Sequence, residues 1–97
     1  MDSTHHFELQ AWNAPSILPR ISLVLSRRRL TPIRMNFSVA ADPRFCHFEF
    51  ALECDGGTAD RLRAQLARLV ELVDVRMQSN VAMLHPTPSE SDRPAAA

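Results

Sequence analysis

The side chains that could do chemistry are few and widely spaced. Glu49 and Glu53 share one face of an extended segment, and paired carboxylates are a common means of general acid–base catalysis. Four residues apart in a strand, however, they lie roughly 13 Å from each other, which is too far for paired work on one bond. We therefore expect both glutamates to belong to a solvated face.

Histidines and cysteines give no metal or disulfide framework. His5 and His6 are adjacent, but no cysteine or acid stands nearby at ligand spacing, and a mobile N-terminus is the simpler interpretation. His47 stands alone on the polar face of its segment. Cys46 and Cys54 would lie roughly 26 Å apart in a strand with a rise of ~3.3 Å per residue, so they cannot bond to each other. This usage is typical of a reducing cytoplasm.

Sequence motifs of catalysis and cofactor binding are missing from the 97 residues. There is no HExxH, Walker loop or GxGxxG, and Asp55-Gly56-Gly57 is expected to be a turn, so we predict no enzymatic activity, metal or cofactor for this chain. Eleven arginines balance eleven acids, and there is no lysine. A formally neutral chain is expected to have no global field that steers nucleic acid or an anionic membrane.

A run of three arginines, Arg27-Arg28-Arg29, has two interpretations. At the end of a helix, positive charge is stabilised by the helix dipole, so the run can be a solvated helix terminus. Alternatively, together with Arg34, it is a docking patch for an acidic partner or a ligand carboxylate.

The composition divides the chain into one small domain and two flanking segments. Residues 1–5 are expected to be flexible, and residues 79–97 form a tail rich in proline, serine and alanine that we predict to be disordered. No run approaches the ~20 apolar residues of a membrane span, and the start lacks a basic and then apolar signal region. We therefore expect a cytoplasmic domain over residues 6–78.

The apolar periodicity switches between two and 3.6 residues along this domain. Ser16 is predicted to cap the first helix with Pro19 at its third residue, and Thr58 to cap the second, whose apolar stripe is Leu62, Leu66, Leu69 and Val70. In chain order, the predicted segments are a strand over His6–Asn13, a helix over Ser16–Arg29, strands over Ile33–Ala40 and Cys46–Leu52, a helix from Thr58, and a strand over Val73–Met77.

This β-α-β-β-α-β order predicts an α+β, ferredoxin-like fold. Two right-handed crossovers place both helices on one face of a four-stranded antiparallel sheet in the order 4-1-3-2. RNA-recognition motifs share this order, and Arg44 to Phe50 faintly resembles their third strand. However, the glycine of that motif is missing, and Phe48 and Phe50 share their side with the apolar residues of the strand. An RNA-binding domain is therefore the least favoured alternative.

Three stretches of the chain resemble the ACT domain, and more closely the small regulatory subunit of acetohydroxyacid (acetolactate) synthase. The stretch Asn13–Ile21 is similar to that family's effector loop and helix start, Leu25–Leu30 to its helix end, and Gln65–Val75 to its closing helix and strand. Met35-Asn36 and Cys46–Leu52 are most similar to the short isozyme II type. The resemblance covers roughly residues 6–78.

The resemblance implies a non-catalytic role. The large catalytic subunit of such a synthase carries thiamine diphosphate, FAD and magnesium, whereas the small subunit binds it, raises its activity and in many members confers feedback inhibition by valine. The residues that match the family's effector site are Asn13, Pro15, Ser16, Ile17, Thr31 and Pro32.

Three departures from the family pattern predict weak or absent valine sensitivity. The loop glycine is Ser16 here, the glycine that ends the first helix is Arg29, and the asparagine before the second strand is Thr31. We expect a homodimer through the second strand and first helix, because the core is small and a sheet edge is open. An amino-acid-binding ACT module that regulates another enzyme is the alternative function.

Overall fold

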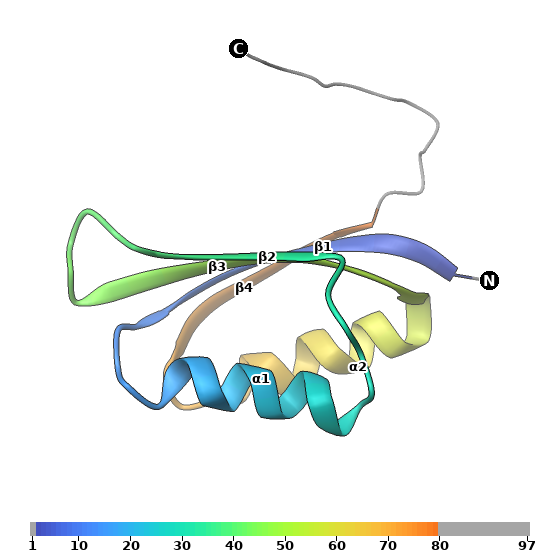
Figure 1. The fold of residues 1–97 in the computed structure, drawn as a ribbon, viewed down its shortest axis with the longest axis horizontal. Helices are drawn as coiled ribbons and strands as arrows, with labels where there is room; N and C mark the ends of the chain where they lie inside the picture. The colour runs from blue at the N-terminus through green and yellow to red at the C-terminus, as the bar shows by residue number, and fades with distance from the viewer. Residues whose placement is uncertain (1, 80–97) are drawn as a thin grey trace, which may run out of the picture.

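The computed structural model describes residues 2–79, and the predictions for Met1 and for the tail beyond Ser79 lie outside that range. The chain alternates strands and helices in the predicted order (Figure 1). The elements are β1 (Asp2–Trp12), α1 (Ile17–Arg27), β2 (Arg34–Val39), β3 (Phe45–Asp55), α2 (Gly56–Ala67) and β4 (Leu72–Ser79).

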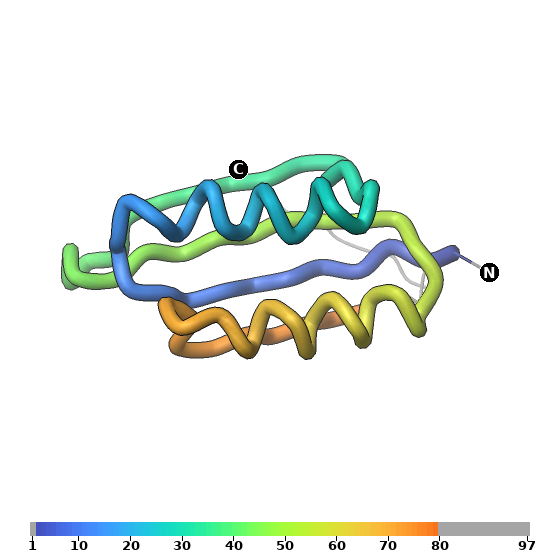
Figure 2. Tube along the Cα trace, turned by 90° about the horizontal axis from the view of Figure 1, so that it is seen from below, coloured from blue at the N-terminus to red at the C-terminus, as the bar shows by residue number. Residues whose placement is uncertain are grey.

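The four strands form one antiparallel sheet in the order β2-β3-β1-β4. Both helices cover the same face of that sheet and run side by side in opposite directions, while the other face is open (Figures 1 and 2). The ferredoxin-like fold and the predicted strand order are therefore confirmed, and β2 and β4 are the two edges of the sheet.

The first strand is longer than the sequence indicated. It begins at Asp2, which pairs with Asp55 of β3, so residues 2–5 are part of the sheet and the expected flexible segment is wrong there. His5 is only 3% exposed. Its Nε2 donates to the Cys54 carbonyl at 3.0 Å, and its Nδ1 lies 2.8 Å from the Ser79 hydroxyl. Both ring nitrogens of His5 therefore make hydrogen bonds within the fold.

The core lies between the sheet and the two helices. Phe48 of β3 is fully buried there, and Phe7 of β1 stacks on Phe50 with ring centroids 4.9 Å apart. Burying each large apolar side chain of this kind contributes about 1.5–3 kcal/mol. The RNA-binding alternative required Phe48 and Phe50 on the open face, and both lie instead beneath the helices.

The start of α1 agrees with the prediction in position but differs in chemistry. Ser16 is the N-cap residue, which places Pro19 third in the helix, but the Ser16 side chain makes no capping bond. Its hydroxyl instead donates to Glu71, which lies in the connection between α2 and β4. Ile17, Ile21, Val24 and Leu25 are buried, as the periodicity predicted.

The start of α2 is three residues earlier than predicted. Asp55 is its N-cap, and the Asp55 carboxylate accepts hydrogen bonds from the N–H and the hydroxyl of Thr58. Gly56 and Gly57 therefore belong to the helix rather than to a turn. Because α2 ends at Ala67, Val70 lies beyond it and is 82% exposed, so it is not part of the buried stripe.

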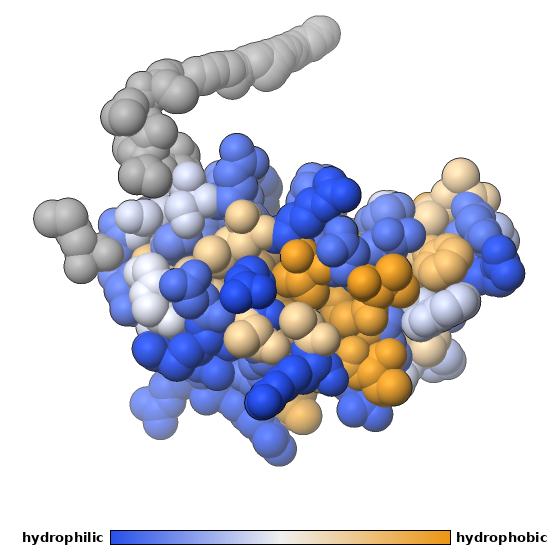
Figure 3. Space-filling view, turned by 180° about the vertical axis from the view of Figure 1, so that it is seen from behind, coloured by the Kyte–Doolittle hydropathy of each residue, from blue (hydrophilic) through white to orange (hydrophobic). Residues whose placement is uncertain are grey.

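Apolar side chains remain exposed along both edges of the sheet. On the β2 side, Ile33, Phe37 and Val39 are exposed. On the opposite side, which Figure 3 shows, apolar surface gathers near the α2–β4 connection and β4, where Val70 and Val73 are exposed. No helix within residues 2–79 is both long and apolar enough to cross a membrane.

The end of α1 carries a left-handed residue that is not glycine. Arg29 has a φ of 57°, and two backbone bonds close the helix: Arg29 N–H to the Ser26 carbonyl and Leu30 N–H to the Leu25 carbonyl. These bonds are the Schellman pattern, in which glycine is the usual residue at this position. A side chain in this conformation costs roughly 1–2 kcal/mol.

We therefore expect R29G to be about 1 kcal/mol more stable than R29A, since both variants remove the charge and only glycine relieves the left-handed backbone. The gain corresponds to roughly 4–8 °C in melting temperature for a domain of this size. Thermal unfolding of the two variants measures it. Equal melting temperatures would show that the φ of Arg29 carries no cost.

Candidate functional site

The connection between β1 and α1, residues 13–16, is held from both sides by backbone bonds. The Trp12 N–H donates to the Glu71 carbonyl at 2.9 Å, and the Asn13 N–H donates to the Arg44 carbonyl at 2.8 Å. The Asn13 side chain also donates to the Pro43 carbonyl at 3.2 Å. Asn13 was predicted as an effector residue, and in the structure its amide ties this loop to the β2–β3 turn.

Glu71, between α2 and β4, brings a buried carboxylate to the start of α1. The residue is only 8% exposed. Its Oε2 accepts from the Ser16 hydroxyl at 2.6 Å and lies 2.9 Å from Arg20 Nε. Its Oε1 is buried and has no hydrogen-bond partner among residues 2–79. The Ser16 hydrogen bond and the Arg20 charge hold the pKa of Glu71 below its usual value, against the opposing effect of burial.

This carboxylate complements a helix start that lacks an acid of its own. The first turn of α1 contains no acidic residue, so Glu71 supplies negative charge to the positive end of the helix dipole. The hydroxyl of Ser16 is used in the same contact. Glu71, Ser16 and Arg20 therefore form one unit, which we call the Glu71 clasp.

Few backbone donors remain at the start of α1 for another anion. The Ile17 N–H donates to the Ala14 carbonyl at 3.1 Å, and Pro19 has no N–H. Of the first three helical residues, Leu18 alone could offer its N–H to a ligand. An anion-binding helix terminus normally offers several converging N–H groups, so this one is poorly equipped.

The predicted effector residues are not brought together within one chain. Ile17 is in the core and Pro15 is exposed at the start of α1, whereas Thr31 and Pro32 follow the other end of that helix. An 11-residue helix is about 16 Å long, so the two groups lie at opposite ends of the domain. Only pairing of two chains could bring the Thr31 group of one to the Ser16 group of another.

The predicted arginine patch is also divided by the fold. Arg28 donates through Nε to Gln65 Oε1 at 2.7 Å and so bridges the two helices. Arg34 lies instead on the open face of the sheet. There, the partial burial of His6 and, to a smaller extent, the charge of Arg34 lower the pKa of His6. Arg27 to Arg29 and Arg34 therefore face opposite sides of the sheet and cannot act as one patch.

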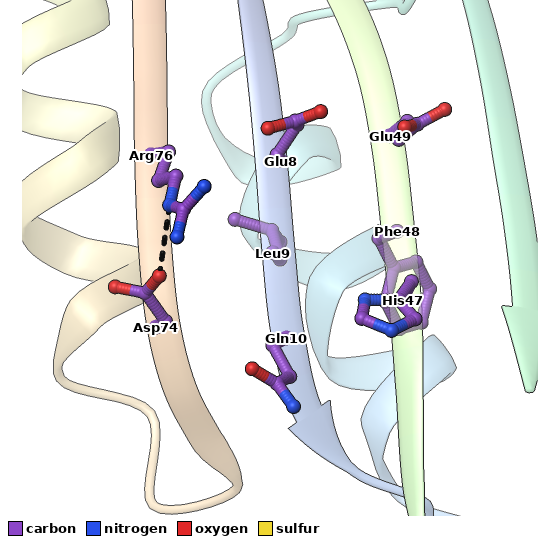
Figure 4. Close-up of a pocket in the computed structure, with 8 residues that line it drawn as sticks. All are labelled: Glu8, Leu9, Gln10, His47, Phe48, Glu49, Asp74 and Arg76. Carbon is purple, nitrogen blue, oxygen red and sulfur yellow. Dashed lines mark hydrogen bonds and ion pairs between the residues drawn. The ribbon is translucent and has the colours of Figure 1, made fainter. Parts of the chain in front are cut away.

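A shallow depression of about 230 Å³ lies on the open face of the sheet (Figure 4). Glu8 and Glu49 stand directly opposite each other across β1 and β3, and Arg76 pairs with Asp74 at 3.1 Å. Carboxylates that face each other in this way repel each other. Among residues 2–79, no group of three side chains is placed to hold a metal ion. The depression offers exposed charge without a positioned catalytic or metal centre.

Sequence reasoning missed the role of Glu71. Two signals were available in the sequence. Glu71 is an acid between two apolar residues, Val70 and Leu72, and the first turn of the helix that begins at Ile17 contains no acid. The pattern could not pair Glu71 with Ser16, because they are 55 residues apart and meet only after the sheet forms.

No protein-family model and no curated protein sequence matches this chain. Its similarity is to solved structures. The ACT domain of a GTP pyrophosphokinase from Chlorobium tepidum superposes with a TM-score of 0.70 at 10% identity, over 80% of this chain and all of that one. This chain has the fold of an ACT domain.

Two further structures extend the comparison. An ACT domain protein from Streptococcus pneumoniae has a TM-score of 0.65 at 11% identity, over 89% of this chain and 98% of that one. The acetolactate synthase small subunit from Thermotoga maritima has a TM-score of 0.69 at 19% identity over 76% of this chain. The chain matches only 46% of that subunit's length.

The Glu71 clasp predicts a specific pH dependence of stability. The folded-state pKa of Glu71 is lowered, so its stabilising effect is complete above the unfolded-state value of about 4.3 and is lost as pH falls through the folded-state pKa. E71Q should therefore be less stable than the wild type near neutrality, and the difference should shrink below about pH 4.

Urea unfolding at neutral and acidic pH measures this difference. E53Q is the matched control, because Glu53 is exposed on the open face, and it should equal the wild type at both pH values. A gap between wild type and E71Q that is unchanged at acidic pH would show that the charge of Glu71 does not stabilise the loop.

Proposed function

We propose that this chain is the non-catalytic, activating small subunit of an acetolactate synthase. The observation that carries the proposal is the combination of the ACT fold with the three sequence stretches that resemble that family. Each stretch falls on the corresponding element: the β1–α1 connection, the end of α1, and α2 with β4. The structural likeness to the Thermotoga maritima subunit supports the same choice.

The geometry of the β1–α1 connection favours weak or absent inhibition by valine. Ser16 could replace a loop glycine if its hydroxyl were free to donate to an effector carboxylate, but that hydroxyl donates to Glu71. Thr31 offers only a short hydroxyl where the family has an amide. Each lost charge-assisted hydrogen bond weakens binding by roughly tenfold to a hundredfold.

A second candidate is an amino-acid-binding module that regulates another enzyme. The likeness to the ACT domain of a GTP pyrophosphokinase favours that alternative, because the match covers the full length of that domain. The two candidates differ in their partner: only the first requires a large thiamine-dependent synthase.

We also propose that two copies pair through β2 and pack their first helices together. The β2 edge offers unpaired backbone groups beside the exposed apolar residues Ile33, Phe37 and Val39. This arrangement would continue the sheet across the dimer. It would also bring the Thr31 region of one copy towards the Ser16 region of the other.

A charged residue on the pairing edge should separate the dimer. V39K places a lysine on β2 at a position that is 52% exposed, and V73K places one on β4 at a position that is 49% exposed. We expect a dimer mass for the wild type and V73K in sedimentation equilibrium at micromolar concentration, and a monomer mass for V39K. Dissociation by V73K alone would assign the interface to the β4 edge.

The functional proposal predicts the outcome of reconstitution with the large catalytic subunit from the same genome. This chain alone should form no acetolactate from pyruvate, and mixing should raise the rate of the large subunit severalfold. Valine at millimolar concentration should change that rate little. An unchanged rate on mixing would refute the proposal and leave the regulator of another enzyme.

A further inference from the structure

Formal neutrality conceals a separation of charge between the two layers of the domain. The two helices with the residues that end them carry seven of the eleven arginines and one acid, Asp60. The strands carry two arginines, Arg34 and Arg76, and six acids, namely Asp2, Glu8, Glu49, Glu53, Asp55 and Asp74. The chain as a whole is formally neutral, but its helical layer is strongly basic at close range.

The bridge from Arg28 to Gln65 shows which sides of the two helices face each other. On α1, Arg28 reaches α2 through this bond, Arg20 faces the end of α2 through its pair with Glu71, and Arg27, two turns after Arg20, shares the side of Arg20. On α2, Arg61 and Arg68 flank Gln65 by four and three residues in the same way. Five arginines therefore line the junction of the helices.

We call this set the arginine seam: Arg20, Arg27, Arg28, Arg61 and Arg68. The helices that carry it lie side by side and antiparallel on the exposed surface of the domain (Figure 2). Four of its members are exposed, and Arg28 is half-buried by its contact with Gln65. Along α1 the seam runs from Arg20 to Arg28, a distance of about 12 Å at a rise of ~1.5 Å per residue.

Carboxylates within the described part of the chain neutralise the seam only in part. Glu71 pairs with Arg20, but the same carboxylate oxygen is shared with Ser16 and closes the Glu71 clasp. Asp55 lies near Arg61: the Thr58 hydrogen bond and, to a smaller extent, the Arg61 charge lower the pKa of Asp55. No ion pair within residues 2–79 involves Arg27, Arg28 or Arg68, and like charges kept together repel each other, so an anionic partner relieves that repulsion.

The surroundings of the seam distinguish between anionic partners. Neither helix contains an aromatic residue, so the seam has no platform on which the bases of a single strand could stack. The guanidinium group, with its planar fork of donors, fits carboxylates in a bidentate manner. The acidic open face on the other side of the sheet also repels a polyanion that wraps around the domain.

We propose that the arginine seam docks an acidic polypeptide surface, such as a partner helix or strand with a row of carboxylates. The occupant is a protein and not a nucleic acid, and this assignment does not depend on which enzyme the chain regulates. The seam lies on the helical face, apart from the β2 edge proposed for dimer formation, so both contacts can form together.

The test is fluorescence anisotropy of a labelled oligoglutamate peptide at low and moderate salt. The wild type should bind, and binding should weaken as salt rises. R61Q/R68Q should bind roughly tenfold more weakly, because two carboxylate contacts are lost. R63Q/R76Q removes the same two charges outside the seam and should bind like the wild type. Circular dichroism checks that both variants fold.

Several results would overturn the proposal. One is no binding by the wild type, and another is equal weakening by the two double variants, which would indicate net charge alone. Tighter binding of labelled poly(U) than of oligoglutamate would assign the seam to nucleic acid. Self-association at low salt that R61Q/R68Q abolishes would identify the occupant as the acidic open face of a second copy.

Discussion

A single buried carboxylate holds together the connection between β1 and α1, where the candidate effector residues begin. Glu71 accepts from Ser16, pairs with Arg20 and receives the Trp12 N–H at its own backbone carbonyl. It therefore joins the end of β1, the start of α1 and the connection into β4. Because α1 has neither a side-chain cap nor a first-turn acid of its own, this contact replaces both.

The same contact bears on regulation. An ACT-type effector site needs donors that are free to meet a carboxylate at the β1–α1 connection. Here the hydroxyl of Ser16 is used by Glu71, the N–H of Ile17 is used by Ala14, and Pro19 has none. The chain thus supplies a carboxylate of its own at this connection, and this supports the proposed insensitivity to valine.

Much of the fold could be predicted from the sequence because its signals are local. Alternation in Ile33–Ala40 and Cys46–Leu52 and the helical stripe from Ile17 to Leu25 predicted the element order, and chain connectivity then predicted the sheet. Other features depend on tertiary contacts. His5 continues the buried side of β1 that holds Phe7 and Leu9, but its polar ring is hydrogen-bonded there only by Cys54 and Ser79, partners far along the chain that local alternation does not encode.

The candidate site was predicted less completely, for two physical reasons. Asp55 outcompetes Thr58 as the cap of α2 because glycines at the next two positions can be drawn into the helix, and a sequence of that kind equally fits a turn. Side-chain partners far apart in sequence, such as Arg28 and Gln65, become visible only when the helices are placed side by side.

Carbon-13 NMR of the side-chain carboxyl groups, followed across acidic pH in the folded protein, tests whether Glu71 is ionised and hydrogen-bonded at the start of α1. The Glu71 resonance should titrate below the ordinary glutamate value of about 4.3, because Ser16 and Arg20 favour the charged form of the carboxyl group. A midpoint at or above that value would show that burial of the carboxylate outweighs its contacts with Ser16 and Arg20.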